Sequence, residues 1–444
     1  MFLVKCGEDL RNDERIELLF DIMNSVIASS STSSTSFSDI PTVPDSMGPD
    51  QSPFEEASRR SKRTNLQART YTVIPMTSEV GIMEWVGDTV TIKAIVSEEM
   101  TLDPGFCNQN QEFFQSDPKD ITRLSASQIR YDWIQGHEAP KYHKMFREKN
   151  EKNGRATHEK ISQLIPEDFI RRRLLKIAVG PEAFITLRAE YVKTLAISSL
   201  FGYILGLGDR HLENLLLDVK TGAIVQIDFG ICFGKGQWGL PVPEFIPFRL
   251  SPQLVGVLQP LDGCVLLRHY MVAAMTSLRE DSGFQIVSNA LQVYINDPLL
   301  DWIGEMEEKG DDEESRNRVE RCLRKLRGVN PGVIMAEELG INSWIKREKS
   351  LSALVSMIQS TCARGVSAGR STTTSSSSSS SSSFSSSSMS YKDSSSEGNR
   401  RNNDVSDGHY TDILEAEEQV DALIALATDP NIIIRQWVGL ATWI

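Results

Sequence analysis

The pattern of apolar positions near the start of the chain predicts a short strand and then a helix. Phe2–Val4 is a run of apolar residues of strand type. Apolar residues then recur at spacings of three and four, the period of an amphipathic helix, and Asn12 or Asp13 is available as its N-cap. They are Ile16, Leu19, Phe20, Met23, Val26 and Ile27. Residues 28–65 are rich in Ser, Thr, Pro and charge, and we predict that they form a disordered insertion.

Two strand-like segments and a long helix are predicted in the next part of the chain. Thr70–Pro75 has the residues of a strand, and Gly81–Val86 is a second short apolar stretch. Phe184–Leu205 is apolar on most faces, so we expect a central helix that is buried on all sides. The glycines of Gly206-Leu207-Gly208 end this helix.

A hairpin and several helices are predicted in the remainder. Leu215–Leu217 and Ile224–Ile227 have the pattern of two strands joined by a turn around Thr221-Gly222. Amphipathic helices are expected to about Cys362, followed by a serine-rich linker and a compact apolar tail. The helix predicted in the tail is broken at Thr428-Asp429-Pro430.

Composition narrows the class of protein. The 444-residue chain is 40% hydrophobic and long enough for two or three domains. Its net charge of -13 argues against a general nucleic-acid surface, which would be basic, and no direct nucleic-acid site is evident. The six cysteines are scattered without a C-x-x-C pair, which favours a reducing compartment over a disulfide framework or a zinc site. The sequence has no secretory signal and no apolar run long enough to span a bilayer, so we expect a soluble intracellular protein.

One set of polar residues has the spacing of a phosphoryl-transfer site. The catalytic loop of a protein kinase supplies an Asp and, five positions later, an Asn, and a D-F-G Asp follows on a later strand. Asp209 and Asn214 have this separation, and the predicted hairpin leads to Asp228-Phe229-Gly230. Three side chains at fixed offsets, in this order of loop and strands, favour a kinase over a loop of solvated polar residues.

The order of residues in this loop differs from that of ordinary protein kinases. There a His precedes the Asp, whereas here His211 follows Asp209 by two residues. The order Asp-Arg-His resembles the phosphoinositide 3-kinase-related protein kinase family. This resemblance implies that Asp209 is the catalytic base and that His211 stabilises charge on the transferring phosphate. It also implies that Asn214 and Asp228 coordinate Mg²⁺, or Mn²⁺ in its place.

The amino terminus resembles the same family. The sequence from Lys5 to Asp13 is similar to the family's lysine-strand signature, which implies that Lys5 contacts the phosphates of ATP, with Glu8 and Asp13 as acidic partners. A solvated lysine in a run of mixed charge is the alternative. The resemblance implies further ATP-binding residues: Tyr71 in the inner pocket, Trp85 beside the adenine, Val86 as a backbone hydrogen-bonding partner of the adenine, and Leu216.

The resemblance also implies the fold class and the order of domains. The expected fold is α+β, with a small β-rich lobe, a large and mainly helical lobe, and a helical carboxy-terminal FATC element. The family has further strands, a phosphate loop and FAT and helical-repeat regions before the lysine strand, so we expect the small lobe to be truncated. The predicted bounds are the truncated small lobe at 1–82, the hinge at 83–87, the large lobe at 88–368 with the catalytic loop at 208–214 and the activation segment at 228–249, the disordered linker at 369–410 and FATC at 411–444.

The activation segment favours a protein as the phosphoryl acceptor. Lipid kinases of the superfamily have a basic cluster there, but this segment has only Lys235 before Arg249. Segments 74–78, 81–85 and 239–250 are most similar to the branch of the family that acts at DNA double-strand breaks. The target-of-rapamycin branch is the alternative.

The first branch implies a nuclear serine/threonine kinase of non-homologous end joining, with a preference for Ser or Thr before Gln. Its implied partners are protein substrates, together with the Ku heterodimer and DNA ends, which would bind through the missing upstream region. A function of another class stays open, because a chain with a truncated small lobe could be a scaffold without catalytic activity.

Overall fold

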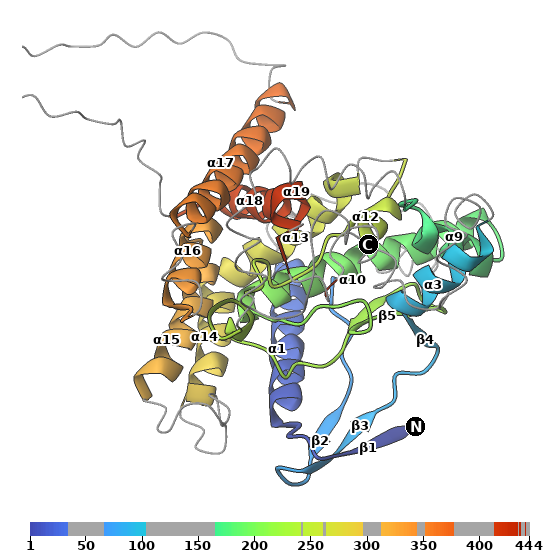
Figure 1. Cartoon of the computed structure of the whole chain (residues 1–444), viewed down its shortest axis with the longest axis horizontal. Helices are drawn as coiled ribbons and strands as arrows, with labels where there is room; N and C mark the ends of the chain where they lie inside the picture. Colours follow the sequence, from blue (N-terminus) through green and yellow to red (C-terminus); the bar gives the residue numbers. More distant parts are fainter. Residues whose placement is uncertain are drawn as a thin grey trace, which may run out of the picture.

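The computed structural model of the chain has two lobes, and its fold is α+β, as predicted (Figure 1). The structure describes residues 1–33, 66–103, 165–240, 243–260, 263–295, 312–343, 351–376, 413–433, 435–436 and 440. Most of the predicted insertion at 28–65 and of the predicted linker at 369–410 therefore lies outside the described residues. None of the helices in the described part of the chain is long and apolar enough to cross a membrane.

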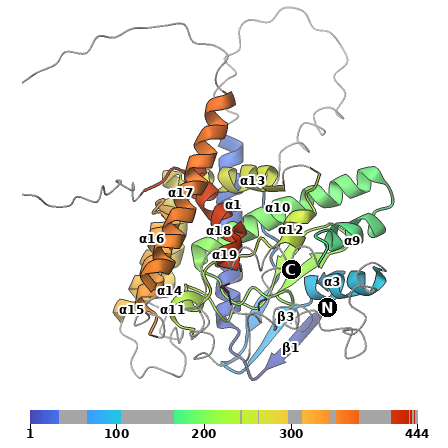
Figure 2. The same cartoon turned by 45° about the horizontal axis from the view of Figure 1, so that its top comes forward.

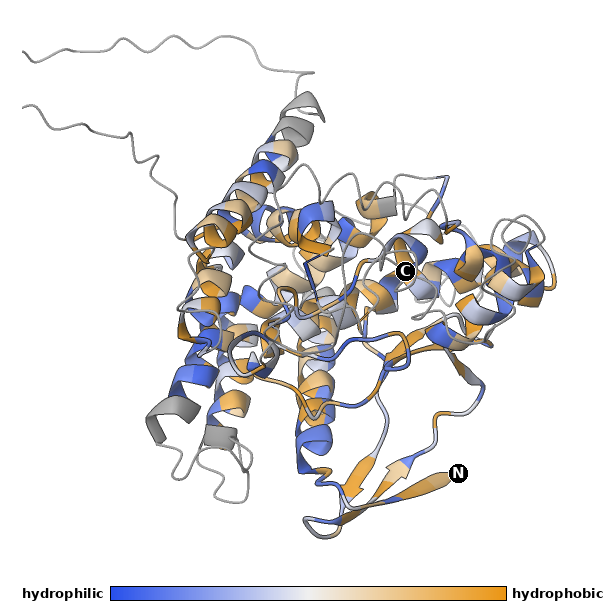
Figure 3. Cartoon of the chain, viewed as in Figure 1, coloured by the Kyte–Doolittle hydropathy of each residue, from blue (hydrophilic) through white to orange (hydrophobic). Residues whose placement is uncertain are grey.

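The small lobe consists of a three-stranded antiparallel sheet and one long helix. The strands are β1 (Phe2–Cys6), β2 (Val73–Pro75) and β3 (Val80–Glu84), in the order β1-β3-β2, and the helix is α1 (Arg11–Ser33). Lys5 pairs with Gly81 across the sheet. β1 lies at the edge, and the ribbon of this strand has the colour of hydrophobic residues in Figure 3. Its apolar side chains stay exposed, since Phe2 is 64% and Val4 61% exposed.

Both ends of α1 differ from the prediction. The helix begins at Arg11, and the Asp9 carboxylate accepts a hydrogen bond from the Arg11 N–H (3.0 Å). Asp13 is therefore not the N-cap but a buried residue of the first turn. The insertion was predicted to begin at residue 28, yet α1 continues to Ser33. Hydroxyls in this last part, such as that of Ser29, donate to the carbonyl four residues earlier (2.7 Å), so their hydrogen bonds are satisfied within the helix.

The large lobe is built around α10 (Pro181–Leu205), which packs against helices on several sides and against a second small sheet. Nearly every residue of α10 from Tyr191 onward is buried, which explains why its sequence is apolar on most faces. The sheet has the order β4-β5-β6 and is antiparallel. Its strands are β4 (Thr89–Thr91), β5 (Leu215–Asp218) and β6 (Ile224–Gln226), so the predicted hairpin is confirmed.

The other helices of the large lobe surround this centre. α3 (Ile92–Leu102) packs on α9 (Phe169–Ile177) beside the sheet, and α11 and α12 are short. The remaining helices form the part that lies to the left and top of Figure 1. The bounds of the helices that follow α10 in the chain are α11 (Lys235–Trp238), α12 (Pro252–Gly256), α13 (Gly263–Arg279), α14 (Asp281–Ile295), α15 (Asp312–Leu326), α16 (Pro331–Ile341), α17 (Leu351–Ser376), α18 (Ala416–Thr428) and α19 (Pro430–Ile433).

α17 extends beyond the start of the predicted linker. The linker was predicted to begin at residue 369, but α17 continues to Ser376, and the helix packs on α18 as far as the turn of Gly369 and Arg370 (Figure 2). Gly369 lies so close to α18 that a Cβ atom there would meet the Asp421 carboxylate, and Arg370 pairs with Glu418 (2.5 Å). α18 ends at Thr428, where the sequence predicts a break.

A glycine lets the end of α10 contact the activation segment. Gly206 ends the helix with φ +61°, and its carbonyl accepts a hydrogen bond from the Gly234 N–H (2.9 Å). A Cβ atom on Gly206 would lie 2.5 Å from the Gly234 backbone nitrogen, which is closer than two such atoms can approach. Neither backbone segment can easily move to relieve this contact.

We therefore expect Gly206→Ala to destabilise the protein by about 2 to 5 kcal/mol, from the left-handed backbone and the overpacking together. Gly340→Ala in α16 is the matched control, because a Cβ atom there meets nothing within 4 Å and its φ is not positive. Thermal unfolding should show a melting temperature several degrees lower for the first variant and little changed for the second. A Gly206→Ala protein that melts with the wild type would contradict this account.

Candidate active site

A cavity of about 340 Å³ lies where the two lobes meet. The small lobe contributes residues of β1, β3 and α1, and the large lobe contributes residues of β4 and β5 and of the segments before β5 and after β6. Many residues that the sequence singled out line it: Lys5, Asp13, Tyr71, Trp85, Val86, Asn214, Leu216 and Asp228. Asp209 and His211 do not line the cavity, but they lie on the same loop as Asn214, and Glu8 reaches it through Lys5. The fold thus gathers the predicted residues at one place.

Lys5 lies in an acidic environment on β1. Its Nζ forms an ion pair with the Glu8 carboxylate, although Glu8 does not itself line the cavity. Partial burial lowers the pKa of Lys5, but the hydrogen bond and charge of Glu8, with the charges of Asp228 and Asp13, raise it above its ordinary value. Lys5 is therefore a stable cation beside the cavity, and the lysine does not have the fully solvated environment of the alternative interpretation.

The outer part of the cavity has aromatic and apolar walls. Trp85 and Val86 follow the end of β3, and Leu216 of β5 lies in the opposite lobe. The Thr89 hydroxyl donates to the Val86 carbonyl (2.8 Å). Among the described residues, no acceptor meets the Val86 N–H, so this donor is available to a flat heterocycle between the two walls.

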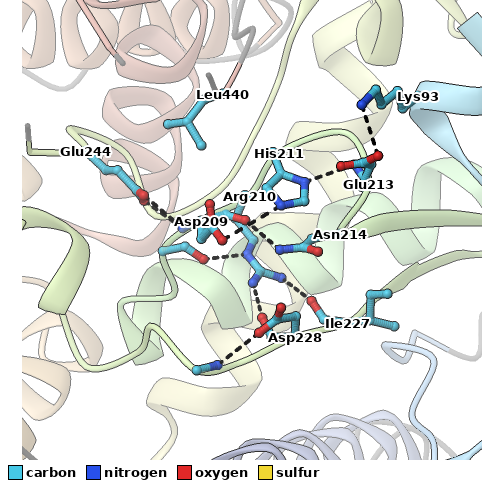
Figure 4. A network of polar contacts seen from close by, with 12 residues as sticks. Lys93, Asp209, Arg210, His211, Glu213, Asn214, Ile227, Asp228, Glu244 and Leu440 are labelled. Atoms are coloured by element: carbon cyan, nitrogen blue, oxygen red, sulfur yellow. Dashed lines mark hydrogen bonds and ion pairs between the residues drawn. The ribbon is translucent and has the colours of Figure 1, made fainter. Parts of the chain in front are cut away.

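The catalytic loop holds Asp209 in an unusual backbone conformation. Asp209 has φ +56°, and the Asn214 side-chain amide donates to its carbonyl (2.9 Å). His211 Nε2 lies 3.8 Å from Asp209 Oδ2. The Glu213 N–H donates to His211 Nδ1 (3.1 Å), which places the proton of a neutral imidazole on Nε2, the nitrogen that faces Asp209 (Figure 4).

Arg210 joins this loop to the segment of Asp228. Its Nε donates to Gly208 O (2.7 Å), and Nη1 donates to Ile227 O (3.0 Å). Nη2 donates to Asp228 O, and Asp228 has φ +62° (Figure 4). The guanidinium thus fixes two neighbouring backbone segments that each carry a carboxylate of the site.

The D-F-G segment is also fixed from the small lobe. Phe229 is completely buried and stacks with Tyr71 (ring centroids 6.5 Å apart). The Phe229 N–H donates to Asp13 Oδ1 (3.1 Å), so Asp13 connects α1 to the segment that presents Asp228.

Burial makes two carboxylates of the site more basic than usual. It raises the pKa of Asp13, against the hydrogen bond from Phe229, and the charge of Asp228 raises it further. It also raises the pKa of Asp209, and Asp228 acts in the same direction, whereas His211 and Arg210 lower it. A carboxylate with a raised pKa holds a proton more readily, which suits a group that must accept one.

The donor set fits a magnesium ion shared with a phosphate ligand. The Asn214 amide nitrogen donates to Asp209 O, so the side-chain oxygen of Asn214 is the atom that could bind a metal. The Asp228 carboxylate lines the same cavity. Mg²⁺ prefers oxygen ligands and is often held by one or two side chains together with substrate phosphates and water. Within the described residues, no three His, Cys, Asp or Glu side chains gather as a metal site.

Sequence reasoning did not find every residue of the site. The cavity is also lined by Leu3, Thr89, Thr91 and Ile227, for which no role was predicted, and by Met83 and Glu84, which lie within the predicted hinge at 83–87. The buried residues Arg210, Glu244 and Arg249 form hydrogen bonds around the catalytic loop. The sequence does mark Glu244 and Arg249, because they are the charged residues of the largely apolar stretch 240–250. A charged residue in such a stretch is expected to be buried with a partner.

The sequence of this chain is similar to a family model and to several curated proteins. A family model described as phosphatidylinositol 3- and 4-kinase matches residues 51–303. The DNA-dependent protein kinase catalytic subunit of Xenopus laevis is 30% identical over 463 residues, which cover 100% of this chain and 9% of that protein. The Dictyostelium discoideum protein of the same name is 28% identical, with 99% and 9% covered. The serine/threonine-protein kinase TOR of Oryza sativa subsp. japonica is 26% identical, with 83% and 13% covered.

A solved structure shares the fold. The structure titled "FAT and kinase domain of CtTel1" superimposes with a TM-score of 0.51 at 24% identity, and the match covers 80% of this chain and 21% of that one. The chain spans about a tenth of the length of the curated relatives it matches.

Proposed function

Because the chain belongs to the phosphatidylinositol 3- and 4-kinase family, we propose that it transfers the γ-phosphoryl group of ATP to serine or threonine hydroxyls of proteins. The observation that carries this proposal is the cavity between the lobes. There the Lys5 cation and the oxygen donors of Asn214 and Asp228 converge, with Asp209 on the adjoining loop. A triphosphate needs cations, a metal needs oxygen ligands and a hydroxyl nucleophile needs a base, and these residues supply each of them.

Each side chain has a defined task in this mechanism. Trp85, Val86, Tyr71 and Leu216 hold the adenine end, and Lys5, oriented by Glu8, contacts the phosphates. Asn214 and Asp228 would hold Mg²⁺, or Mn²⁺ in its place, which neutralises charge on the phosphates when bound. Asp209 accepts the proton of the attacking hydroxyl, and His211 donates a hydrogen bond from Nε2 to the phosphoryl group. Asp13 holds the D-F-G segment through Phe229. The proposal also includes 83–87 as hinge and 411–444 as a FATC element.

Two features support a protein acceptor. Between Asp228 and Arg249 the activation segment has only one basic residue, Lys235, whereas an anionic lipid headgroup would need several. Relatives named DNA-dependent protein kinase, smg-1 and TOR are described as protein kinases.

A direct competition between acceptors tests this choice. The purified full chain, given radiolabelled ATP and Mg²⁺, should label Ser-containing peptides and leave phosphatidylinositol vesicles unlabelled. Labelled lipid with unlabelled peptide would refute the protein-acceptor proposal. A protein that labels neither acceptor would instead favour a scaffold without catalytic activity.

We further propose a role in DNA double-strand break repair by non-homologous end joining. The support is the likeness to DNA-dependent protein kinase catalytic subunits over essentially the whole chain. Under this proposal the enzyme acts in the nucleus, prefers Ser or Thr before Gln, and meets the Ku heterodimer and DNA ends through regions outside this chain. The likeness to TOR supports the alternative, a target-of-rapamycin-like kinase.

The acceptor sequence and the effect of DNA distinguish these two. A Ser-Gln peptide should be phosphorylated faster than the matched Ser-Ala peptide, and, where regions that bind Ku and DNA ends accompany this chain, these partners should raise the rate. Equal rates on both peptides and no response to DNA ends would favour the target-of-rapamycin alternative.

A further inference from the structure

Glu244 is a buried carboxylate of the activation segment that lies against the catalytic loop. Its side chain is 4% exposed, although the surrounding sequence 245–248 is apolar. The Glu244 N–H donates to Gly236 O (2.9 Å), which fixes the backbone beside α11. Glu244 does not line the nucleotide cavity, so it has no direct contact with a ligand there.

The carboxylate of Glu244 meets the backbone of the proposed catalytic base. The Asp209 N–H donates to both of its oxygens, at 2.9 Å each (Figure 4). Asp209 has φ +56°, a conformation that costs a non-glycine residue about 1 to 2 kcal/mol and must be held by its surroundings. The hydrogen bond to Glu244 is a contact that holds it.

Two glycines form the space into which the carboxylate fits. A Cβ atom on Gly208 would lie 3.0 Å from Glu244 Oε2, and a Cβ atom on Gly236 would lie 2.9 Å from it. Gly208 is itself fixed to the start of the activation segment, because its N–H donates to Ile231 O (2.8 Å). The space between Gly208 and Gly236 therefore closely matches the Glu244 carboxylate and leaves little room for a side chain of another shape at position 244.

Buried Arg210 is a counter-charge for Glu244, and Arg249 connects Arg210 to the carboxy-terminal segment. Burial raises the pKa of Glu244 to about 7, and the charge of Asp209 acts in the same direction, whereas the hydrogen bond from the Asp209 N–H and the charge of Arg210 favour the ionised form. The Arg210 guanidinium also donates to Asp228 O. Arg249 donates to Arg210 O (3.0 Å) and to Leu440 O (2.6 Å), so the carboxy-terminal segment is joined to this cluster. Removing the carboxylate would thus take from buried Arg210 one of its counter-charges, beside those of Asp228 and Asp209.

We propose that Glu244 is a positioning residue, which holds the Asp209 backbone in its left-handed conformation and thereby directs the base toward the acceptor hydroxyl. This inference rests on the proposed function. Without the carboxylate, the Asp209 N–H loses its acceptor and the backbone relaxes toward a conformation with negative φ. The base then moves away from the hydroxyl, and a misplacement of about 1 Å can cost a rate of about 100-fold.

The test compares kcat and KM for ATP in Glu244 variants of the full chain. Glu244→Gln keeps the shape but not the charge, and one amide oxygen can still accept from Asp209; we expect kcat to fall about tenfold. Glu244→Ala should lower kcat about 100-fold. KM for ATP should stay within about twofold in both variants, since an effect on kcat alone marks a group that acts after ATP has bound.

Asn342→Ala is the matched control for a purely structural role. Asn342 is completely buried and holds the activation segment by donating to Gln237 O (2.8 Å) and Leu240 O (3.0 Å), but it does not touch Asp209. The comparison is made between Glu244 and Asn342 variants whose melting temperatures fall by similar amounts. Among these, kcat should fall in the Glu244 variants and stay near the wild-type value in Asn342→Ala. If Asn342→Ala loses as much kcat, or if Glu244→Gln and Glu244→Ala lose none, the positioning role is wrong. An inactive wild-type protein would instead refute the proposed function and this inference with it.

Discussion

Asp209→Asn is expected to lower kcat for peptide phosphorylation about 10² to 10⁴-fold, the usual contribution of a general base. The amide cannot accept the proton of the acceptor hydroxyl, whereas its shape and its tolerance for positive φ are those of Asp. Because Asp209 does not line the nucleotide cavity, binding of ATP should be unchanged. Single-turnover kinetics with radiolabelled ATP, together with a fluorescent nucleotide displacement assay, would measure both quantities.

Asp88→Asn is the matched control for this substitution. Asp88 also has positive φ, +58°, but it is exposed and pairs with Lys220 outside the cavity. The same chemical change at the same backbone conformation should leave kcat nearly unchanged. An Asp209→Asn protein as active as Asp88→Asn would exclude Asp209 as the base.

Lys5→Met is expected to lower kcat/KM for ATP about 100-fold, within the range seen when one preorganised group that stabilises charge is removed. Lys5 is a cationic residue of the small lobe that lines the cavity. Burial lowers its pKa, but Glu8, Asp228 and Asp13 together raise the pKa above its ordinary value and keep Lys5 protonated. Methionine keeps the apolar stem and removes the charge, so the phosphates lose a counter-charge. Steady-state kinetics over a range of ATP concentrations would measure the effect.

Lys93→Met provides a closely matched comparison. Lys93 is 28% exposed and pairs with Glu213, much as Lys5 is 30% exposed and pairs with Glu8, but it lies outside the cavity. It should lose little activity. Equal losses in the two variants would mean that the Lys5 effect is a general effect of surface charge and not of phosphate binding.

The elements that could be predicted from the sequence are those whose apolar pattern is fixed by their own burial. α10 is apolar all round because it packs on several sides, and the hairpin of β5 and β6 has a local turn. Helix ends were predicted poorly, because they depend on contacts outside the helix. The Asp9 carboxylate accepts from the Arg11 N–H where α1 begins, and Arg370 of α17, beyond the predicted start of the linker, pairs with Glu418 of α18.

The same distinction applies to the site. Asp209, Asn214 and Asp228 could be placed from spacing because one loop and one hairpin bring them together. Glu244 and Arg249 could not, since their partners depend on tertiary structure: Glu244 accepts from a residue 35 positions away, and Arg249 donates to a carbonyl 191 positions away. No local period encodes such contacts, and only the unusual position of a charge in an apolar stretch marks them.

The most direct test of the central claim is to locate bound nucleotide by diffraction or cryo-electron microscopy, with a non-hydrolysable ATP analogue and Mn²⁺. The account predicts the adenine beside Trp85, the phosphates at Lys5, and the anomalous signal of Mn²⁺ at Asn214 and Asp228. Nucleotide bound elsewhere on the chain, or Mn²⁺ held without these two side chains, would contradict it.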